Sequence, residues 1–354
     1  MKKIRVLVVG LGNMGLSHAR AYQSISEFEI AGLCTRGIES RHDLKKEFPI
    51  TALFSDYTTA LTTLKPDAVS INTWPDTHAT YAKMAFNAGC HVFIEKPLAD
   101  SVAEARAIAD MASKANLKLV IGYILRVHPS WIKFVEVGKT LGKPLVMRMN
   151  LNQQSSGAQW QVHKHLMNSV SPIVDCGVHY VDVMCQVTGA KPVRVHAMGV
   201  RLTPEIKDSM YNYAQLQVAF DDGSVGWYEA GWGPMMSETA FFIKDMIGPN
   251  GSVSIAMEES KTSSSNVDSH TKTNALRIHH AKLNEQGLFS AADNIIHMSD
   301  EPGHQELCKR EQEIFRDAIL HDSDLTAHVD DAINSLRIVL AADESVRTGQ
   351  VIML

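Results

Sequence analysis

The first third of the chain alternates short apolar runs with segments whose apolar residues recur at helical spacing. Ile4–Val9 (IRVLVV) is a β-rich run of the kind found in strands that are buried on both faces of a sheet. Similar runs follow at Phe28–Cys34, Ala68–Asn72, His91–Ile94 and Leu117–Ile121. The segments between them, for example Thr77–Ala88 and Ser101–Ala115, have the length and periodicity of helices. Strands that alternate with helices predict βαβ units and therefore a parallel sheet.

The pattern changes near Arg126, where strand-like segments follow one another with few helices between them. They are Leu145–Leu151, Val193–Leu202, Tyr211–Phe220 and Ser224–Trp232. In the third segment apolar and polar residues alternate, which is the period of a half-buried strand, and the hairpin signal 221–223 (DDG) follows it. Helical spacing returns over 307–319 and 329–340. We expect one domain at 1–125 and a second at 126–354 whose mostly antiparallel sheet is open on one face, with the C-terminal helices packing back toward the first.

Length and composition limit the possible classes of protein. The 354 residues suit two domains, and the net charge of −5 argues against a basic nucleic-acid-binding surface or a membrane-surface patch. No apolar run approaches the roughly 18 residues that a membrane helix needs, and the first run ends at Gly10 with no cleavage signal after it. Five widely spaced cysteines without a CxxC pair predict reduced thiols in a cytoplasmic protein.

A glycine-rich turn separates the first predicted strand from the first predicted helix. Residues 10–15 (GLGNMG) match G-x-G-x-x-G, in which glycines allow a tight turn, close approach of the backbone to a pyrophosphate, and close helix–strand packing. The N–H groups at the start of the following helix can then bind phosphate oxygens. We expect the turn to bind a dinucleotide through Gly10, Gly12, Asn13, Met14 and Gly15.

The end of the second predicted strand bears on which nicotinamide cofactor would bind. An acidic residue that holds the adenosine ribose is usual about 20 residues after the glycines, but Thr35 and Arg36 stand here. A hydroxyl and a guanidinium can bind a 2′-phosphate, which a carboxylate would repel. The cofactor is therefore expected to be NAD or NADP with a slight preference for NADP, although Arg36 also has the simple interpretation of a solvated surface charge.

Four features together resemble the glucose–fructose oxidoreductase / inositol dehydrogenase / rhizopine-catabolism (Gfo/Idh/MocA) family. They are the GLGNMG turn, the triplet 95–97 (EKP), the pattern D-x-G-x-H-x-x-D over 175–182, and the tail from Phe315 to Ala341. The resemblance implies an α/β fold: an N-terminal Rossmann domain with a doubly wound parallel sheet, then an α/β domain with an open, mostly antiparallel sheet. It also implies an NAD(P)-dependent oxidoreductase acting on a sugar, a sugar derivative or an inositol-like polyol. Family members commonly associate through the open sheet, so a homo-oligomer, dimer or tetramer, is expected.

Lys96 is the first residue expected to take part in catalysis. It follows the predicted strand His91–Glu95, and ligands of open parallel sheets bind at the carboxyl ends of the strands. The resemblance makes Lys96 a residue that contacts the substrate hydroxyl and relays its proton. On position alone, an exposed lysine at a strand end would be the simpler interpretation.

Asp175 and His179 complete the expected catalytic set. Ser171-Pro172 has the form of a helix start and Gly189 that of a helix end, which places Asp175 and His179 four residues apart on one helix. A carboxylate beside a histidine suits a general base near neutral pH. The resemblance makes His179 the base and Asp175 a substrate-binding partner, with a less certain role for Asp182. A surface Asp–His pair is the simpler alternative.

Further site residues come from the resemblance, together with one departure from it. Cofactor contacts are expected from Thr73, Trp74, His78, Glu95 and Lys96, and substrate contacts from Tyr123, Arg126, Trp160, Lys164, Asp175 and His179. Many members of the family carry a Gly-Gly pair shortly before the aspartate, where this chain has 168–172 (NSVSP). The loop should therefore differ in shape, and the substrate of any relative does not transfer directly.

Three other classes of function compete with the dehydrogenase. A metal enzyme could be drawn from His163, His165, Asp175 and His179, but no supporting pattern accompanies that set, so no metal is expected. A catalytically silent dinucleotide-binding regulator would have no need of Lys96, Asp175 and His179 together. A glycosidase that oxidises its sugar transiently with NAD would use the same residues and release product without net cofactor reduction.

Overall fold

The computed structural model describes residues 2–49, 51–237, 243–256, 273–299 and 301–354. The chain divides into two compact units. The first comprises Met1–Ile124 and Pro302–Ile333, and the second comprises Leu125–Glu301 and Asn334–Leu354. The segment 302–333, which was expected in the second domain at 126–354, belongs to the first unit.

The first unit is built on a six-stranded sheet in the order β3-β2-β1-β4-β5-β6. Its strands are β1 (Ile4–Val9), β2 (Phe28–Cys34), β3 (Ala52–Phe54), β4 (Ala68–Ile71), β5 (His91–Glu95) and β6 (Leu119–Gly122). Every neighbouring pair is parallel. This order reverses direction between β1 and β4, and ligands of doubly wound sheets bind at that point. The predicted parallel Rossmann sheet is confirmed.

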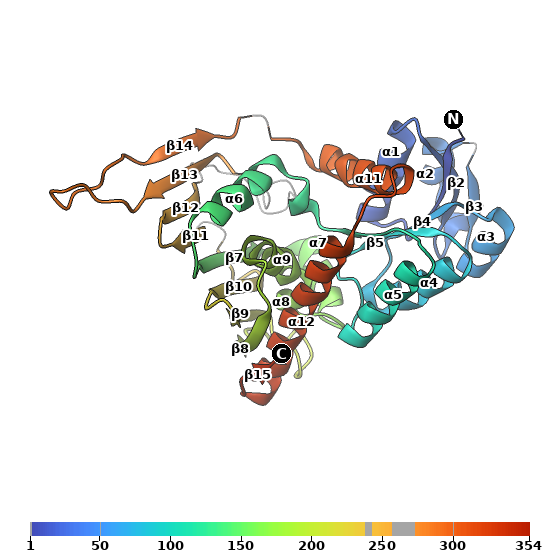
Figure 1. The fold of residues 1–354 in the computed structure, drawn as a ribbon. Coiled ribbons are helices and arrows are strands. Elements are labelled where there is room, and N and C mark those ends of the chain that lie inside the picture. The colour runs from blue at the N-terminus through green and yellow to red at the C-terminus, as the bar shows by residue number, and fades with distance from the viewer. Residues whose placement is uncertain (1, 50, 238–242, 257–272, 300) are drawn as a thin grey trace. The chain divides into compact units, whose positions relative to one another are not determined.

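Helices flank this sheet (Figure 1). They are α1 (Asn13–Ser24), α2 (His42–Glu47), α3 (Tyr57–Leu64), α4 (Pro75–Asn87), α5 (Val102–Lys114) and α11 (His304–Leu320), with a short 3₁₀ turn η1 (Ile38–Ser40). The core on one side of the sheet joins Val6 and Val8 of β1 to Tyr22 of α1 and Phe315 of α11. A helix from near the C-terminus therefore completes the apolar core of the N-terminal unit.

The second unit contains a nine-stranded sheet in the order β14-β13-β12-β11-β7-β10-β9-β8-β15. Its strands are β7 (Val146–Gln154), β8 (Pro192–Val200), β9 (Tyr213–Phe220), β10 (Val225–Gly233), β11 (Lys244–Gly248), β12 (Gly251–Ala256), β13 (Ala275–His280), β14 (Asn294–His297) and β15 (Ile352–Met353). The pair β7–β10 is parallel and the other neighbours are antiparallel, which confirms the predicted mostly antiparallel sheet.

The helices of the second unit follow the short turn η2 (Ile124–Arg126). They are α6 (Pro129–Thr140), α7 (Gly157–Leu166), α8 (Pro172–Asp175), α9 (Gly177–Thr188) and the long C-terminal α12 (Thr326–Thr348), whose second half belongs to this unit. Contacts of α6, α8 and α9 with β7, β10 and β12 bury one face of the sheet. No helix in the described parts of the chain is both long and apolar enough to cross a membrane.

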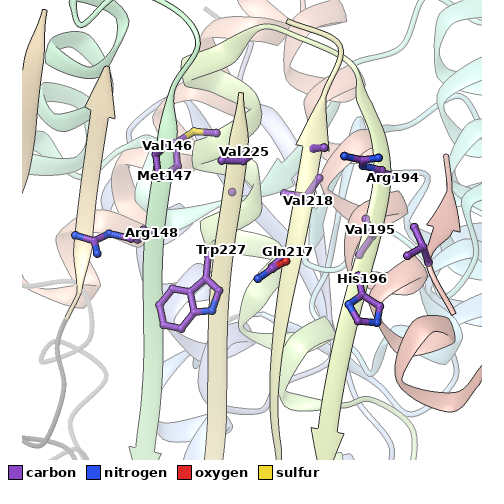
Figure 2. Close-up of a pocket in the computed structure, with 13 residues that line it drawn as sticks. Val146, Met147, Arg148, Arg194, Val195, His196, Gln217, Val218, Val225 and Trp227 are labelled. Carbon is purple, nitrogen blue, oxygen red and sulfur yellow. The ribbon is translucent and has the colours of Figure 1, made fainter. Parts of the chain in front are cut away.

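The other face of the sheet is open and carries a row of side chains across four strands. Arg148, Trp227, Gln217 and His196 lie beside one another on β7, β10, β9 and β8 (Figure 2). They line a shallow depression together with apolar residues such as Val146 and Val225. The alternation that the sequence shows in 213–220 is therefore the alternation between a helix-covered face and an open face.

Candidate active site

The glycine turn after β1 is shaped by close backbone contacts. Gly10 has a positive φ of 82°, and a Cβ there would lie 2.5 Å from the Asn72 carbonyl oxygen. A Cβ on Gly15 would lie 1.7 Å from the Gly10 carbonyl oxygen, so only glycine fits. Beside Gly12, in contrast, the space is open. Two glycines are thus required by the turn itself, and Gly12 leaves room for something outside the chain to approach the backbone.

The start of α1 suits an anion. Gly12 is its N-cap residue, no side chain caps the first turn, and the first turn contains no acidic residue. Gly12 and Asn13 are exposed, so the N–H groups of this turn face solvent. Unsatisfied N–H groups and the positive end of the helix dipole favour a phosphate at this position. The residues present therefore fit the pyrophosphate of a dinucleotide.

The end of β2 carries Thr35 and the exposed Arg36, as the sequence predicts, and no carboxylate among residues 34–38. A nearby arginine that the sequence analysis did not consider, Arg41, donates to the Leu11 carbonyl within the glycine turn at 3.0 Å. Burial raises the pKa of the Cys34 thiol to about 12, so this cysteine remains protonated. The Arg41 side chain therefore connects the segment after β2 to the glycine turn. Arg36 remains exposed to solvent.

The loop after β4 is braced by a buried histidine. His78 is completely buried, with Nδ1 at 2.8 Å from the Pro97 carbonyl and Nε2 at 3.0 Å from the Thr73 carbonyl. Burial lowers the pKa of His78, so the neutral ring donates to one carbonyl at a time. Trp74 is 41% exposed at the start of α4. His78 thus connects the loop after β4 with the loop after β5, and Trp74 offers an exposed aromatic surface beside it.

Lys96 follows β5 directly, and its neighbour Glu95 points inward. Glu95 is 7% exposed, and its Oε1 lies 2.7 Å from Nε2 of the buried His18. Its other oxygen accepts a hydrogen bond from the Lys96 backbone N–H at 3.2 Å. Lys96 itself is half-buried. The carboxylate of Glu95, expected from the sequence to contact cofactor, thus has two partners within the protein.

In the second unit, Asp175 and His179 lie on two successive helices rather than on one. Ser171 caps α8 by accepting from the Val174 N–H, and Gly189 ends α9 in the left-handed region, as predicted. A single residue, Cys176, separates the two helices: its N–H still bonds to the Pro172 carbonyl at 3.1 Å, whereas the His179 N–H bonds to the Cys176 carbonyl, only three residues back. The next residue is Gly177, where a Cβ would lie 2.9 Å from the Tyr228 ring, so the chain packs closely on β10 there.

Asp175 and His179 are nevertheless more exposed to solvent than the residues around them. Within residues 171–180 only these two are half-exposed, and the other eight are buried. The carboxyl and the imidazole, four residues apart, are therefore both partly exposed, although Nδ1 of His179 is buried.

Asp182 has a structural partner that spacing alone does not reveal. Its carboxylate, 1% exposed, accepts hydrogen bonds from Arg126 at 2.8 and 2.5 Å and from Gln186 at 2.8 Å. Arg126, expected to contact substrate, is thereby held against α9 by a buried ion pair. The ion pair holds the Arg126 side chain in one orientation. Removing either residue would leave the charge of the other buried and uncompensated.

The two residues predicted before the aspartate, Trp160 and Lys164, share the partner Glu205. Trp160 is 6% exposed, packs in a cluster with Met167 and Trp232, and has its Nε1 3.3 Å from Glu205 Oε1. Lys164 donates to Glu205 at 2.6 Å and lies 5.5 Å from the Trp160 ring centroid. Trp160 is therefore chiefly a core residue, and Tyr123, at 2% exposure, is buried as well.

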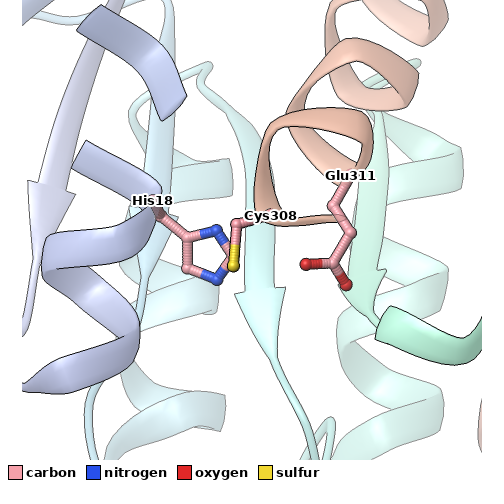
Figure 3. Close-up of side chains that lie close together, drawn as sticks. All are labelled: His18, Cys308 and Glu311. Atoms are coloured by element: carbon pink, nitrogen blue, oxygen red, sulfur yellow. The ribbon is translucent and has the colours of Figure 1, made fainter. Parts of the chain in front are cut away.

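The metal set drawn from the sequence does not assemble. His163 stacks on Trp232 with ring centroids 4.6 Å apart, and burial lowers its pKa to about 4. His18, Cys308 and Glu311 are the group in the described residues whose potential ligand atoms lie within 4.8 Å of one another (Figure 3). None of these three belongs to the predicted set of His163, His165, Asp175 and His179.

Two long-range hydrogen-bonding contacts near the site were not predicted from the sequence. Gln312 of α11 donates to His18 at 2.9 Å, and Asp343 of α12 accepts from Ser171 at 2.7 Å and from Tyr211. Each lies on a C-terminal helix with no motif around it. The only available signal was that His18, a polar residue, falls on the buried face of its helix.

These observations define a class: a Rossmann unit whose glycine turn can hold a dinucleotide, joined to a unit with a large, half-open sheet. The chain belongs to the Gfo/Idh/MocA family. Residues 4–123 match the oxidoreductase family with an NAD-binding Rossmann fold, and residues 136–243 match the GFO/IDH/MocA C-terminal domain.

Individual relatives point to the same group. The chain is 32% identical over 208 residues to UDP-N-acetylglucosamine 3-dehydrogenase of Acidithiobacillus ferrooxidans, a match that spans 59% of this chain and 62% of that protein. It is 26% identical over 266 residues to scyllo-inositol 2-dehydrogenase (NAD⁺) of Bacillus subtilis, covering 72% and 74%. The crystal structure of scyllo-inositol dehydrogenase from Lactobacillus casei with NAD(H) and scyllo-inositol shares the fold, with a TM-score of 0.78, 22% identity and 99% coverage of both chains.

Proposed function

We propose that this protein is an NAD(P)-dependent oxidoreductase that moves a hydride between the nicotinamide and a ring carbon of a sugar, a sugar derivative or a cyclic polyol. The observation that carries the proposal is the shared edge of the first sheet. The glycine turn, Thr73 and Lys96 follow β1, β4 and β5, three adjacent parallel strands, so all three lie at their carboxyl ends. The N–H groups that can bind an anion and the amine of Lys96, which can hydrogen-bond a hydroxyl, therefore lie at one edge of the sheet.

The names of the relatives support the substrate class. The two curated relatives described above are dehydrogenases of a nucleotide sugar and of an inositol. Both names describe the dehydrogenation of a polyhydroxylated ring, which is N-acetylglucosamine in one protein and an inositol in the other. We take the shared chemistry, a secondary alcohol on a polyhydroxylated ring, as the substrate class of this chain.

The roles of the residues follow from what a secondary alcohol requires. When bound, the nicotinamide supplies the hydride acceptor. Lys96 and Asp175 hold the reacting hydroxyl, and His179 takes its proton, which is a suitable task for an imidazole near neutral pH. Arg126 supports this set through Asp182 of α9, the helix that also carries His179.

For the cofactor we propose NAD or NADP, with a slight preference for NADP. The support is the end of β2, where Thr35 and the exposed Arg36 replace the usual acid. A guanidinium open to solvent can pair with a 2′-phosphate, and no carboxylate in this segment repels one.

The test is the absorbance of reduced nicotinamide, with NAD and NADP each offered against inositols, aldoses, sugar acids and UDP-N-acetylglucosamine. Net reduction with any member supports the dehydrogenase, and the pattern of active isomers identifies the carbon. Silence with tight cofactor binding would support a catalytically silent regulator. Release of an aglycone without net reduction would support a glycosidase with transient NAD redox.

We also propose that copies of this chain associate through the open sheet face into a dimer or tetramer. Large apolar side chains remain exposed there, including Met198 at 60% and Met353 at 72%. Analytical ultracentrifugation of a Met198→Glu/Trp227→Glu variant should show the protomer mass, because buried charge opposes association. Val162→Glu, an exposed valine on α7, is the matched control and should leave the mass unchanged. An unchanged mass in the double variant would exclude this face.

A further inference from the structure

A buried polar chain leads from α11 through α1 to the strand end that carries Lys96. Gln312 Nε2 lies 2.9 Å from His18 Nδ1, and His18 Nε2 lies 2.7 Å from Glu95 Oε1. Glu95 Oε2 then accepts the backbone N–H of Lys96. Both His18 and Gln312 are completely buried. The three side chains connect segments almost 300 positions apart and end at the residue proposed to hold the substrate.

These contacts define the tautomer of His18. The Gln312 amide nitrogen can only donate, so Nδ1 of His18 accepts and Nε2 carries the ring proton. Glu95 must then accept that proton as a carboxylate. The Glu95 carboxylate therefore lies between the His18 ring and the Lys96 backbone N–H.

A second carboxyl lies in the same buried region. Glu311 of α11 is 4% exposed, and within the described chain neither of its oxygens has a hydrogen-bond partner. Burial, with the charge of Glu95 nearby, raises the pKa of Glu311 well above its ordinary range. Two buried carboxylates side by side would repel strongly in a medium of low polarity. A proton on Glu311 removes that repulsion.

A metal ion is the obvious alternative occupant, because His18, Cys308 and Glu311 have ligand types and spacing that suit one. The contacts argue against it. Both ring nitrogens of His18 are already used by Gln312 and Glu95, and the Cys308 thiol lies 3.5 Å from His304 Nε2. A metal would have to break the His18–Glu95 or the His18–Gln312 hydrogen bond.

Other groups around the cluster limit its charge and its movement. Tyr22 of α1 is buried, and burial raises its pKa far above the ordinary value, so it is neutral. Further ionisable groups near the cluster are His304 and Cys308 on α11 and the buried His78, on which the charge of Glu95 acts. At Gly122 of β6, a Cβ would lie 3.3 Å from Glu95 Oε1, so the neighbouring strand leaves Glu95 little space to move.

We propose that His18 and Glu311 are positioning residues for Lys96. His18 holds the Glu95 carboxylate against the Lys96 backbone, and Glu311 stays protonated so that this buried region has no second negative charge. This inference rests on the proposed function for its kinetic readout. It assigns a role to two residues outside the predicted site.

The kinetic test compares His18→Leu with His18→Gln in the full-length chain. The leucine leaves Glu95 without its donor, and kcat should fall roughly 100-fold while NAD affinity, measured by fluorescence titration, stays unchanged. Glutamine can donate to Glu95 and accept from Gln312, so it should restore most of kcat. Equal loss in both variants would show that the histidine itself takes part in the chemistry and would overturn the proposal.

Glu311→Gln tests the proton separately, because an amide imitates a neutral carboxyl. The pH profile of kcat should match that of the unmodified chain, whereas Glu95→Gln should shift it. A shifted profile in Glu311→Gln would mean that Glu311 is ionised, which contradicts the proposal. If His18→Leu does not fold, His18→Gln and Glu311→Gln still decide the outcome.

Two measurements need no turnover and therefore separate this inference from the proposed function. Infrared spectra at neutral pH should show a protonated-carboxyl C=O band that is lost in Glu311→Gln and kept in Glu95→Gln. Elemental analysis of the purified protein should show no stoichiometric transition metal. Loss of the band in Glu95→Gln instead, or a bound metal that disappears in Glu311→Gln, would overturn the proposal even if no substrate is ever found.

Discussion

The two units position their candidate groups in different ways. In the first, the glycine turn, Thr73 and Lys96 each follow a buried parallel strand, so the sheet itself brings them to one edge. In the second, Asp175 depends on Ser171, whose hydroxyl caps α8 and also bonds Asp343, 172 positions further along the chain. The comparison shows that a site built at strand ends is encoded locally, whereas one built on short helices depends on distant side chains.

In the first unit, a substitution at Gly15 is expected to have the largest effect on stability and on cofactor binding. Gly15→Ala places a methyl group 1.7 Å from the Gly10 carbonyl oxygen, so the turn must open. We expect a loss of about 3 kcal/mol or more in the free energy of unfolding, together with loss of NAD binding. Chemical denaturation and fluorescence titration check both.

Gly12→Ala is the matched control, because the space beside Gly12 is open and its φ of −76° suits alanine. Its stability should stay within about 0.5 kcal/mol, while NAD affinity falls because the methyl group occupies the approach to the backbone. Unchanged affinity in Gly12→Ala would mean that the pyrophosphate does not bind at this turn.

The next largest effect is expected at two proposed catalytic residues, Lys96 in the first unit and His179 in the second. Lys96→Ala and His179→Ala should each lower kcat by about 10²- to 10⁴-fold, since each removes a group that holds or accepts the hydroxyl proton. Cofactor affinity should be preserved in both. Retained turnover in either variant would remove that residue from the proposed roles, and loss of NAD binding in Lys96→Ala would assign it to the cofactor instead.

Acid should destabilise the second unit through His163. Its pKa of about 4 is lower than that of a histidine in the unfolded chain, so the unfolded state binds the extra proton below about pH 6.5. Its contribution to stability is therefore complete above that pH and is lost as the pH falls toward 4, by roughly 3 kcal/mol in total. His163→Gln should flatten this part of the curve of unfolding free energy against pH. An identical slope in the variant would locate the acid sensitivity elsewhere, for example at His78.

The smallest expected effect sharpens the cofactor assignment. Arg36→Ala should weaken NADP binding by roughly tenfold and leave NAD binding nearly unchanged, because only NADP carries a 2′-phosphate. Thr35→Ala should act in the same direction and more weakly. Equal losses for the two cofactors would mean that Arg36 does not contact the 2′-phosphate.

The sequence predicts the first unit well because its rules are local. An apolar run, a glycine turn and the end of a strand are all visible within about ten residues, and the structure has the parallel strands where the pattern puts them. In the second unit the same reasoning finds the Ser171 cap and the Gly189 end correctly. It fails at Cys176, which separates the two helices just before Gly177 packs closely on Tyr228.

What the sequence could not predict are partners on other elements. Arg126 was expected at the substrate, but it pairs with Asp182, and nothing near either residue indicates the pairing. Glu95 was expected at the cofactor, and its partner His18 lies 77 positions earlier. The short strands β11 and β13 were missed because strand pairing, rather than a marked alternation, stabilises them.

The parallel pairing of β7 with β10 has a consequence for how the second unit assembles. Among the described strands β7 pairs with β10 and β11, which follow it by about 80 to 100 residues. The central strand of the sheet therefore cannot pair until most of the chain has been synthesised, and closing such long loops slows folding. Until then the side chains of Met147 and Met149, which are completely buried in the folded unit, stay uncovered on the nascent chain, and exposed apolar surface of this kind favours aggregation.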